Sequence, residues 1–416
     1  MRVQRCKGSR DLSPEEMRAF RLIEEVFRDC CLKWGYEEVR TPTLEYLHLF
    51  TSTGTLTPSM LGKVYSFLDW DGWSGERVVL RPDGTIPVAR LYIDSMEGKG
   101  LAKLSYVANV FIFEPTGKET RERWQCGAEL IGVSSPIADV ELIIMALEVL
   151  NRLKLGGAEL RLSHAGVIRA LLAKLGLSPG ERAKIFDQIL DGDVDALARL
   201  KPESPEVGRA LPLLLDLKGK SSGLLKNSRA LLTRDLPELE SPLDDFISIV
   251  DLVDALGCDY QIDIASGKGF EYYTGAIFQL FIGEQKIGGG GRYDALIPLM
   301  GGKDTPASGF ALYLDPLMNL VKPETLANPV GERILIRAEP SQPQTVKEGF
   351  SIASRLRQAG YVAGVHPGGQ EPANLRWMLD VQSKAPRFIL TDQINHQRTE
   401  AQTSAEILSR LGEKRR

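Results

Sequence analysis

The chain has 416 residues, more than one compact core usually holds, so we expect two or three domains. Its 43% hydrophobic and 25% charged residues exclude a disordered chain, a collagen-like repeat and a disulfide scaffold. The 51 Lys and Arg against 55 Asp and Glu leave a net charge of −4, so no global positive field attracts nucleic acid, and we expect no nucleic-acid partner.

Residue usage also indicates the compartment. The five cysteines form no CxxC pair, and their odd count fits a reducing environment. The four histidines lie far apart in the sequence, so no zinc-ligand spacing is present, and we predict neither metal nor cofactor. The first ten residues lack a signal-peptide core, and no apolar run reaches the roughly eighteen residues of a membrane helix. We therefore expect a cytoplasmic protein with no membrane partner.

A capping box predicts the start of the first helix. Ser13 precedes Pro14 and lies three residues before Glu16, the spacing at which each side chain can bond the other's backbone. Apolar residues then recur at three- and four-residue steps as far as Trp34, and Gly35 ends the pattern.

Short apolar runs predict a sheet. They are spaced irregularly rather than in βαβ units, so we expect an antiparallel sheet, together with a long helix over 138–153. The expected strands are 36–40, 78–80, 106–113, 128–133, 260–264, 276–282 and 308–314.

Changes in composition predict the domain organisation. Between about 165 and 256, Leu, Ala, Lys and Asp dominate with helical periodicity, which predicts a helical insertion within a domain of residues 1–320. The proline-containing stretch 321–331 is expected to be a linker. Residues 332–416 alternate strand and helix patterns, with one helix expected near 371–379, and predict a small α/β domain.

Two segments place polar groups beside predicted strands. Asp83 and Thr85 project from a turn after 78–80; the alternative is a charged turn whose aspartate accepts hydrogen bonds from backbone amides. Gln125 and Glu129 fall at period two on one face of a strand. They predict a polar pocket, because buried polar groups need partners, or else an open sheet face wetted by solvent.

Two further segments are rich in glycine. Lys268 lies between two glycines and is followed by Tyr272 and Tyr273, which could approach a ligand or form a hairpin with one tyrosine in the core. Residues 288–294 contain four consecutive glycines, which could bring the backbone close to a ligand or form a loose turn. The latter segment matches neither a phosphate-binding Walker loop nor a dinucleotide fingerprint.

Taken together and in this order, the four segments resemble the class II aminoacyl-tRNA synthetases, and among them histidyl-tRNA synthetase. The likeness runs from Gly8 to Ala311, and 332–416 resembles a shortened anticodon-binding domain. It implies an α+β fold with an antiparallel class II sheet, flanking helices, a helical insertion and a small C-terminal α/β domain. It also implies a homodimer formed around the first helix and the strand that ends at Pro42.

The resemblance further implies a histidine pocket. The family places an acid, a threonine and a glutamine on the ammonium group, which match Asp83, Thr85 and Gln125. Its imidazole-reading acid and tyrosine match Glu129 and Tyr273.

Four other residues complete the candidate set. Lys268 is expected to pair with the histidine carboxylate, and Tyr272 belongs to the same segment. Arg90 and Arg292 are second-rank candidates, for which structural roles are favoured.

The departures from the synthetase concern its arginines. Ile112 stands where the family has the arginine that binds the α-phosphate of ATP, Pro316 stands where the γ-phosphate arginine belongs, and Lys268 replaces a third arginine. Glu119 lies near a position that is usually basic. One transition-state arginine is worth roughly 10³–10⁵ in the rate of phosphoryl chemistry, so we expect synthetase activity to be lost and no catalytic residue to remain.

This pattern is similar to a paralogous family, the regulatory subunits of ATP phosphoribosyltransferase, which residues 162–172 also resemble. The resemblance implies a non-catalytic partner of the short-form catalytic subunit, required for the first step of histidine biosynthesis. It also implies feedback inhibition with L-histidine as the effector, bound in the synthetase-like pocket or, in some members, at a subunit interface.

Three alternatives stay open from the sequence. The chain could be a divergent, active histidyl-tRNA synthetase. Its C-terminal domain could read RNA, although that segment lacks interleaved aromatic and basic residues. An amino-acid ligase paralogue would still need the missing arginines.

Overall fold

The computed structural model describes residues 4–53, 61–69, 75–113, 116, 120–178, 204–215, 217–264, 272–322, 333–368 and 375–413, with isolated positions between 180 and 199. The chain divides into two compact units, Met1–Leu326 and Ala327–Arg416, and most of the expected linker 321–331 lies outside the described residues. Within the described part, no helix is long and apolar enough to cross a membrane.

The first helix, α1, spans Pro14–Lys33 and confirms its sequence signal. The Ser13 side chain accepts a hydrogen bond from the Glu16 backbone, and the Glu16 side chain accepts one from the Ser13 backbone. Phe20 and Phe27 recur on one face and are buried against the sheet domain's core.

Over the described residues, the larger sheet of the first unit has nine strands in the order β1-β5-β6-β12-β11-β10-β7-β9-β8. The predicted antiparallel pairing holds through its centre, but β1 pairs with β5 and β7 with β9 in parallel, so the sheet is mixed. Each parallel pair is separated by a long stretch of chain, which a parallel connection requires. The strands are β1 Glu37–Glu38, β5 Ala102–Phe111, β6 Glu122–Ile131, β7 Glu159–His164, β8 Lys218–Gly219, β9 Tyr260–Asp263, β10 Ala276–Ile282, β11 Gln285–Arg292 and β12 Ala307–Tyr313.

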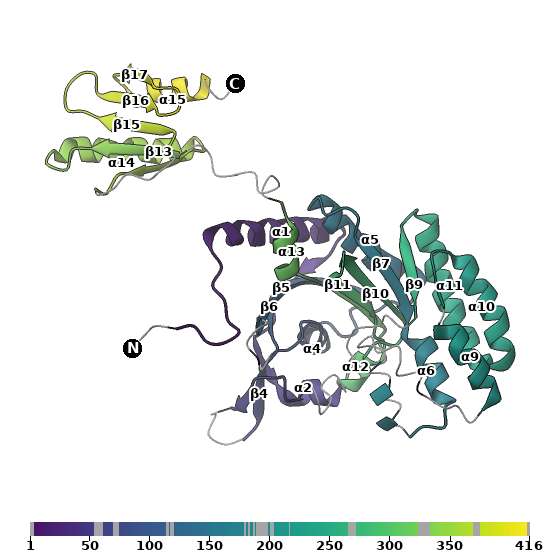
Figure 1. Cartoon of the computed structure of the whole chain (residues 1–416). Coiled ribbons are helices and arrows are strands. Elements are labelled where there is room, and N and C mark those ends of the chain that lie inside the picture. The colour runs from purple at the N-terminus through teal and green to yellow at the C-terminus, as the bar shows by residue number, and fades with distance from the viewer. Residues whose placement is uncertain are drawn as a thin grey trace. The chain divides into compact units, whose positions relative to one another are not determined.

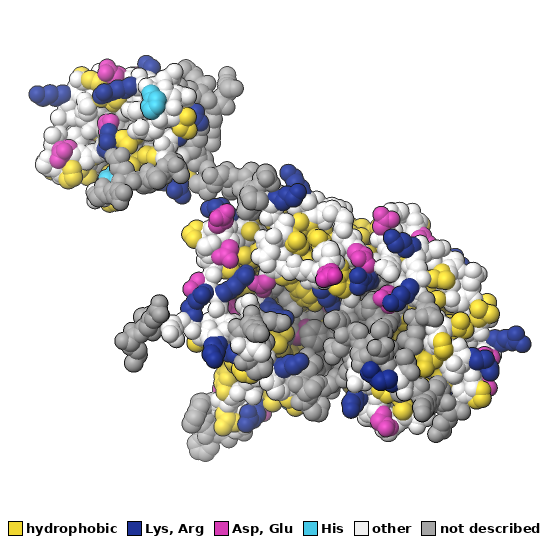
Figure 2. Space-filling model, viewed as in Figure 1, with side chains coloured by type: hydrophobic (Ala, Val, Ile, Leu, Met, Phe, Trp, Pro, Cys, Tyr) yellow, Lys and Arg dark blue, Asp and Glu magenta, His cyan; other side chains and the backbone are white. Residues whose placement is uncertain are grey.

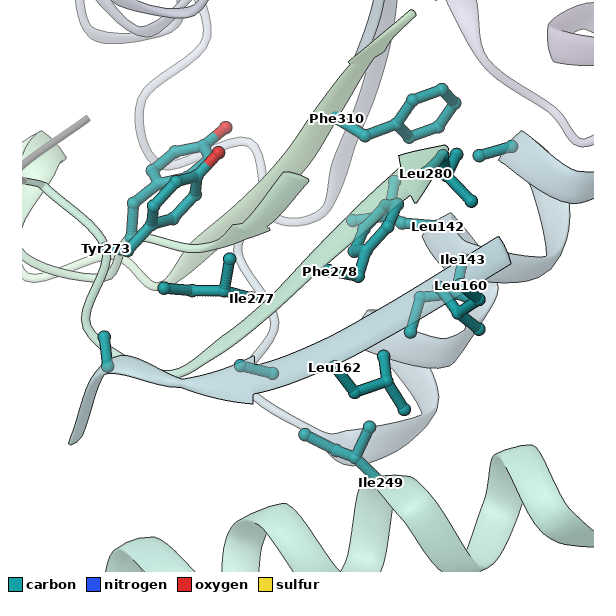
Figure 3. Close-up of a cluster of buried hydrophobic side chains, with 14 of the residues drawn as sticks. Leu142, Ile143, Leu160, Leu162, Ile249, Tyr273, Ile277, Phe278, Leu280 and Phe310 are labelled. Carbon is teal, nitrogen blue, oxygen red and sulfur yellow. The ribbon is translucent and has the colours of Figure 1, made fainter. Parts of the chain in front are cut away.

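Helices cover one face of this sheet (Figure 1). Besides α1, these are α5, Pro136–Arg152, and α11, Glu240–Ala255, which pack against each other and against the sheet. Figure 3 shows the apolar core between them, built from alternate residues of β7 and β10 and from both helices. Its side chains include Leu142, Ile143, Leu160, Leu162, Ile249, Phe278 and Leu280. The opposite face of the sheet is therefore the one left to carry a site.

The remaining elements of the first unit surround that core. A small sheet, β2-β4-β3, precedes α4, and the helices α6, α9, α10 and η1, like α11, fall within the range predicted for the insertion. Their bounds are β2 Leu44–Tyr46, α2 Leu47–Ser52, β3 Ser66–Leu68, β4 Arg77–Leu80, α4 Thr85–Ser95, α6 Ala165–Ala173, α9 Pro205–Leu215, α10 Ser222–Asp235, η1 Pro237–Leu239, α12 Leu296–Leu299 and α13 Leu314–Leu320.

The second unit is a five-stranded sheet in the order β14-β13-β15-β16-β17 with helices α14 and α15. The helix expected near 371–379 is wrong from Trp377 onward, where β15 forms; residues 371–374 lie outside the described part. Trp377, Met378 and Leu379 are all buried, as in a central strand covered on both faces. The elements are β13 Arg333–Ala338, α14 Pro343–Gln358, β14 Val362–Val365, β15 Trp377–Val381, β16 Phe388–Asp392, β17 Gln397–Ala401 and α15 Ser404–Glu413.

The surface charge is mixed. On the face drawn in Figure 2, Lys and Arg side chains are interspersed with Asp and Glu over the described residues. This distribution accords with the small net charge of −4.

Candidate functional site: an acidic pocket above a glycine floor

The pocket face of the sheet has a floor of glycines. Glu129 on β6 lies opposite Gly309 on β12, which lies opposite Gly291 on β11 and then Ile277 on β10. Residues directly opposite each other share a face, so this row points away from α1, α5 and α11. The four-glycine run is therefore a central strand, not a loose turn.

Because glycines have no side chains, the floor leaves room for two polar side chains, those of Glu129 and Tyr106. A Cβ placed on Gly309 would lie 1.7 Å from the Glu129 Oε2 atom, and a Cβ on Gly127 would lie 2.2 Å from the Tyr106 ring. Larger residues at these positions would force Glu129 and Tyr106 out of place.

Above the floor lies a pocket of about 480 Å³, the open space at its mouth included. It brings together five candidates that are far apart in sequence. Glu129 is not part of the lining but hydrogen-bonds two lining residues, Thr85 and Tyr293, at what we call the inner end of the pocket. Lys268 lies outside the described residues. The lining residues are Asp83, Thr85, Gln125, Tyr272, Tyr273, Ile277, Phe278, Lys286, Gly289, Gly290, Tyr293, Gly309, Phe310, Ala311 and Tyr313.

Glu129 is held between two hydroxyl groups. The Thr85 Oγ1 atom donates to Glu129 Oε1 at 2.8 Å, and the Tyr293 hydroxyl donates to Oε2. Only 1% of Glu129 is exposed, and this burial raises its pKa to about 8, although both hydroxyls oppose the rise. At pH 7 the carboxyl group is therefore mostly neutral.

Asp83 serves the fold and the pocket together. Its Oδ1 atom accepts a hydrogen bond of 2.8 Å from the Ile86 backbone in the first turn of α4, as the turn interpretation expected. The same side chain lines the pocket. Burial raises its pKa to about 6, against the stabilising backbone hydrogen bonds from Ile86 and its neighbours.

Gln125 presents an unsatisfied acceptor. Its Oε1 atom is buried and has no hydrogen-bond partner among the described residues, and the side chain lines the pocket. An unpaired buried acceptor costs about 1–3 kcal/mol, so this atom favours a polar ligand or water. Together with Asp83 in the lining and Glu129 at the inner end, it makes this side of the pocket an acceptor-rich site suited to a ligand with several N–H donors.

The two second-rank arginines lie outside the pocket lining. Arg292 is buried and binds Asp139 on α5 through Nε at 3.1 Å and Nη2 at 2.9 Å. Arg90 binds Glu45 on β2 with Nε and Nη2. Both arginines therefore have structural roles: each links two elements of the fold through an ion pair.

Sequence reasoning missed two tyrosines of the lining. Tyr293 follows β11 at period two from Gly291, on the pocket side, and Tyr313 ends β12 opposite Gln125. The signal for Tyr293 was present in the Gly-Arg-Tyr-Asp segment, but it required reading the glycine run as a strand.

The expected phosphate-binding positions carry no described cation. Ile112 follows β5, and its backbone N–H donates to the Arg121 carbonyl. Pro316 lies in the first turn of α13 beside Asp315, whose carboxylate pairs with Arg10 at 2.7 Å. Glu119 lies outside the described residues.

Comparison with known proteins gives consistent results. Residues 8–317 match the family model of histidyl-tRNA synthetase. An ATP phosphoribosyltransferase regulatory subunit of Dehalococcoides mccartyi is 54% identical over 98% of both chains. A histidine–tRNA ligase of Methanocaldococcus jannaschii is 32% identical over 91% of this chain and 88% of its own.

Solved structures support the same fold. A structure from Bacillus halodurans, described as an ATP phosphoribosyltransferase regulatory subunit/histidyl-tRNA synthetase, superposes with a TM-score of 0.76 at 23% identity, covering 90% of this chain and 95% of that one. A histidyl-tRNA synthetase from Nostoc gives 0.74 at 18% identity over the full length of both chains.

Proposed function

This chain belongs to the histidyl-tRNA synthetase family and, within it, to the ATP phosphoribosyltransferase regulatory subunits, and we propose that its pocket binds L-histidine as the effector of that enzyme. The chain is a non-catalytic subunit in histidine biosynthesis. Its partner is the catalytic subunit of ATP phosphoribosyltransferase, of the short form in our proposal.

The observation that carries the histidine proposal is the acceptor-rich pocket. In our assignment, Asp83, Thr85 and Gln125 bind the ammonium group, which satisfies the orphaned Gln125 Oε1 atom. At the inner end, Glu129 accepts an N–H of the imidazole and Tyr273 lies beside the ring. Two buried carboxyl groups suit a ligand that brings one positive charge and a neutral N–H donor.

The same geometry disfavours a nucleotide. A triphosphate needs preorganised cations, and proline, isoleucine and aspartate at 316, 112 and 315 supply none. Lysine at 268 lacks the planar fork of an arginine. The pocket therefore retains the residues that match an amino-acid site but lacks the arginines that bind phosphates in an adenylating site.

The regulatory mechanism that we propose is linkage. Histidine inhibits only to the extent that it binds the less active state of the complex more tightly than the active one. Such coupling typically amounts to about 1–3 kcal/mol. A homodimer around α1 and the strand ending at Pro42 is the assembly unit that we propose for this chain.

We expect the short catalytic chain to transfer phosphoribosyl groups to ATP efficiently only when mixed with this protein. Added histidine should then lower the rate by about 5–150-fold, the range that typical coupling energies allow. The measurement is the initial rate of the catalytic chain alone, with this protein, and with this protein and histidine. A catalytic chain whose rate is indifferent to this protein would refute the regulatory role, and activation without histidine sensitivity would refute the effector assignment.

A further inference from the structure

Tyr293 contacts Glu129, the buried acid at the inner end of the pocket. Its hydroxyl donates to Glu129 Oε2, the same oxygen that lies directly above the bare backbone of Gly309. The other oxygen, Oε1, accepts from Thr85 on α4. The carboxyl group is therefore fixed at both oxygens, by groups from two different segments.

Tyr293 itself is immobilised from three sides. Its backbone N–H donates to the Ala307 carbonyl at 2.7 Å, and its ring packs edge-on against Tyr272 with centroids 5.5 Å apart. The preceding residue, Arg292, is tied to Asp139 by two hydrogen bonds. Only 2% of its surface is exposed, so close-packed neighbours hold the ring.

We propose that Tyr293 is a positioning residue for Glu129, and that Tyr293, Thr85 and the space above Gly309 together make the inner end of the pocket selective for ligand rings that donate an N–H. This inference rests on the proposed histidine site and names what gives it specificity. Each carboxylate oxygen has two acceptor sites. Thr85 occupies one site on Oε1 and Tyr293 one site on Oε2, so one site on each oxygen is left for the ligand. A site built to accept an N–H rejects an isosteric ring without one, because its acid would be left unpaired.

Other groups also act on this acid. Desolvation is the largest influence on the pKa of Glu129 and raises it. The hydrogen bond from the Tyr293 hydroxyl is the largest influence that lowers this pKa, and the charge of Asp83 raises it further. Removing the Tyr293 hydroxyl should therefore make Glu129 harder to ionise. The ionisable groups that interact with Glu129 are Tyr36, Asp83, Tyr106, Tyr272, Tyr273 and Tyr293.

The test is Tyr293→Phe in the full chain, with Tyr313→Phe as the matched control, since Tyr313 lines the same pocket and donates no hydrogen bond to Glu129. We expect Tyr293→Phe to weaken histidine binding by about 10–100-fold, the usual value of a hydrogen bond to a charged group. Its preference for histidine over thienylalanine, a five-membered ring without N–H, should shrink by a similar factor. The pH midpoint of binding should move upward in Tyr293→Phe alone.

A ligand-free measurement separates this inference from the proposed function. Carbon-13 NMR of the glutamate carboxyl groups should show Glu129 titrating at higher pH in Tyr293→Phe than in the wild type or in Tyr313→Phe. Gly309→Ala, which displaces Oε2 directly, should give the same loss of selectivity. An unchanged Glu129 midpoint in Tyr293→Phe would overturn the inference, whereas a wild type that binds no histidine would overturn only the proposed function.

Discussion

Replacing Glu129 with glutamine is expected to abolish measurable histidine binding and, at the same time, to stabilise the ligand-free protein at alkaline pH. Binding is lost because the amide cannot present two charged acceptor oxygens to an imidazole N–H. The gain in stability follows from burial, because ionising Glu129 in the folded protein is unfavourable. The two effects have one cause, since the acid that recognises the ligand is buried away from water.

The sign of the pH dependence is fixed by the direction of the shift. The pKa of Glu129 is about 8 in the folded chain against an ordinary value of 4.5, so its stabilising contribution is complete below pH 4.5 and is lost as the pH rises through 8. Glutamine has nothing to ionise. The free energy of unfolding of Glu129→Gln should therefore exceed that of the wild type by roughly 2–4 kcal/mol at pH 9, with little of this pH-dependent difference near pH 5.

Urea unfolding at pH 5, 7 and 9, together with calorimetry of histidine binding, measures both effects. Glu148→Gln is the matched control, because Glu148 on α5 accepts from the Trp34 indole at 2.8 Å on the helix-covered face, away from the pocket. It should bind histidine like the wild type. Retained histidine affinity in Glu129→Gln would remove this residue from the site, and a loss of stability at pH 9 would contradict the burial argument.

The purified chain is expected to catalyse no histidine-dependent exchange of pyrophosphate into ATP. Adenylate formation concentrates negative charge on phosphates, and fixed arginines are its main stabiliser. Ile112 and Pro316 remove two of these donors, and Asp315 beside Pro316 adds a negative charge at the same turn. With a loss of roughly 10³–10⁵ for one such arginine, exchange should fall below detection.

A histidyl-tRNA synthetase assayed in parallel supplies the positive control for this exchange. Robust exchange by the chain would establish the divergent synthetase in place of the regulatory subunit. Such exchange would point to Lys268, or to Lys286 in the pocket lining, as the phosphate-binding cation.

Much of the site could be predicted from local patterns. Period-two spacing on one strand identified Gln125 and Glu129 as neighbours on one face, and the resemblance added Asp83, Thr85 and Tyr273; the structure brings all of them together. Whether they bind histidine remains a proposal. Local patterns suffice here because strand periodicity determines which side chains share a face.

The remaining features could not be predicted, because they depend on pairing between strands that lie far apart in the sequence. The glycine run of β11 has no side chains to signal a strand, so its central position depended on its partners β10 and β12. Tyr293 was missed for the same reason. The segment that begins at Trp377 was predicted as a helix because short apolar runs do not distinguish a buried strand from a helix.

The central claim is that this pocket binds histidine and no longer binds a nucleoside triphosphate. Isothermal titration of the wild-type chain with L-histidine, repeated in saturating ATP and in buffers of different ionisation enthalpy, tests it most directly. We predict saturable binding that ATP leaves unchanged and that releases a proton at pH 7, because the ionised form of Glu129 is the stronger acceptor for the imidazole N–H and binding therefore favours it. Absence of histidine binding, or tight ATP binding strengthened by histidine, would contradict the account.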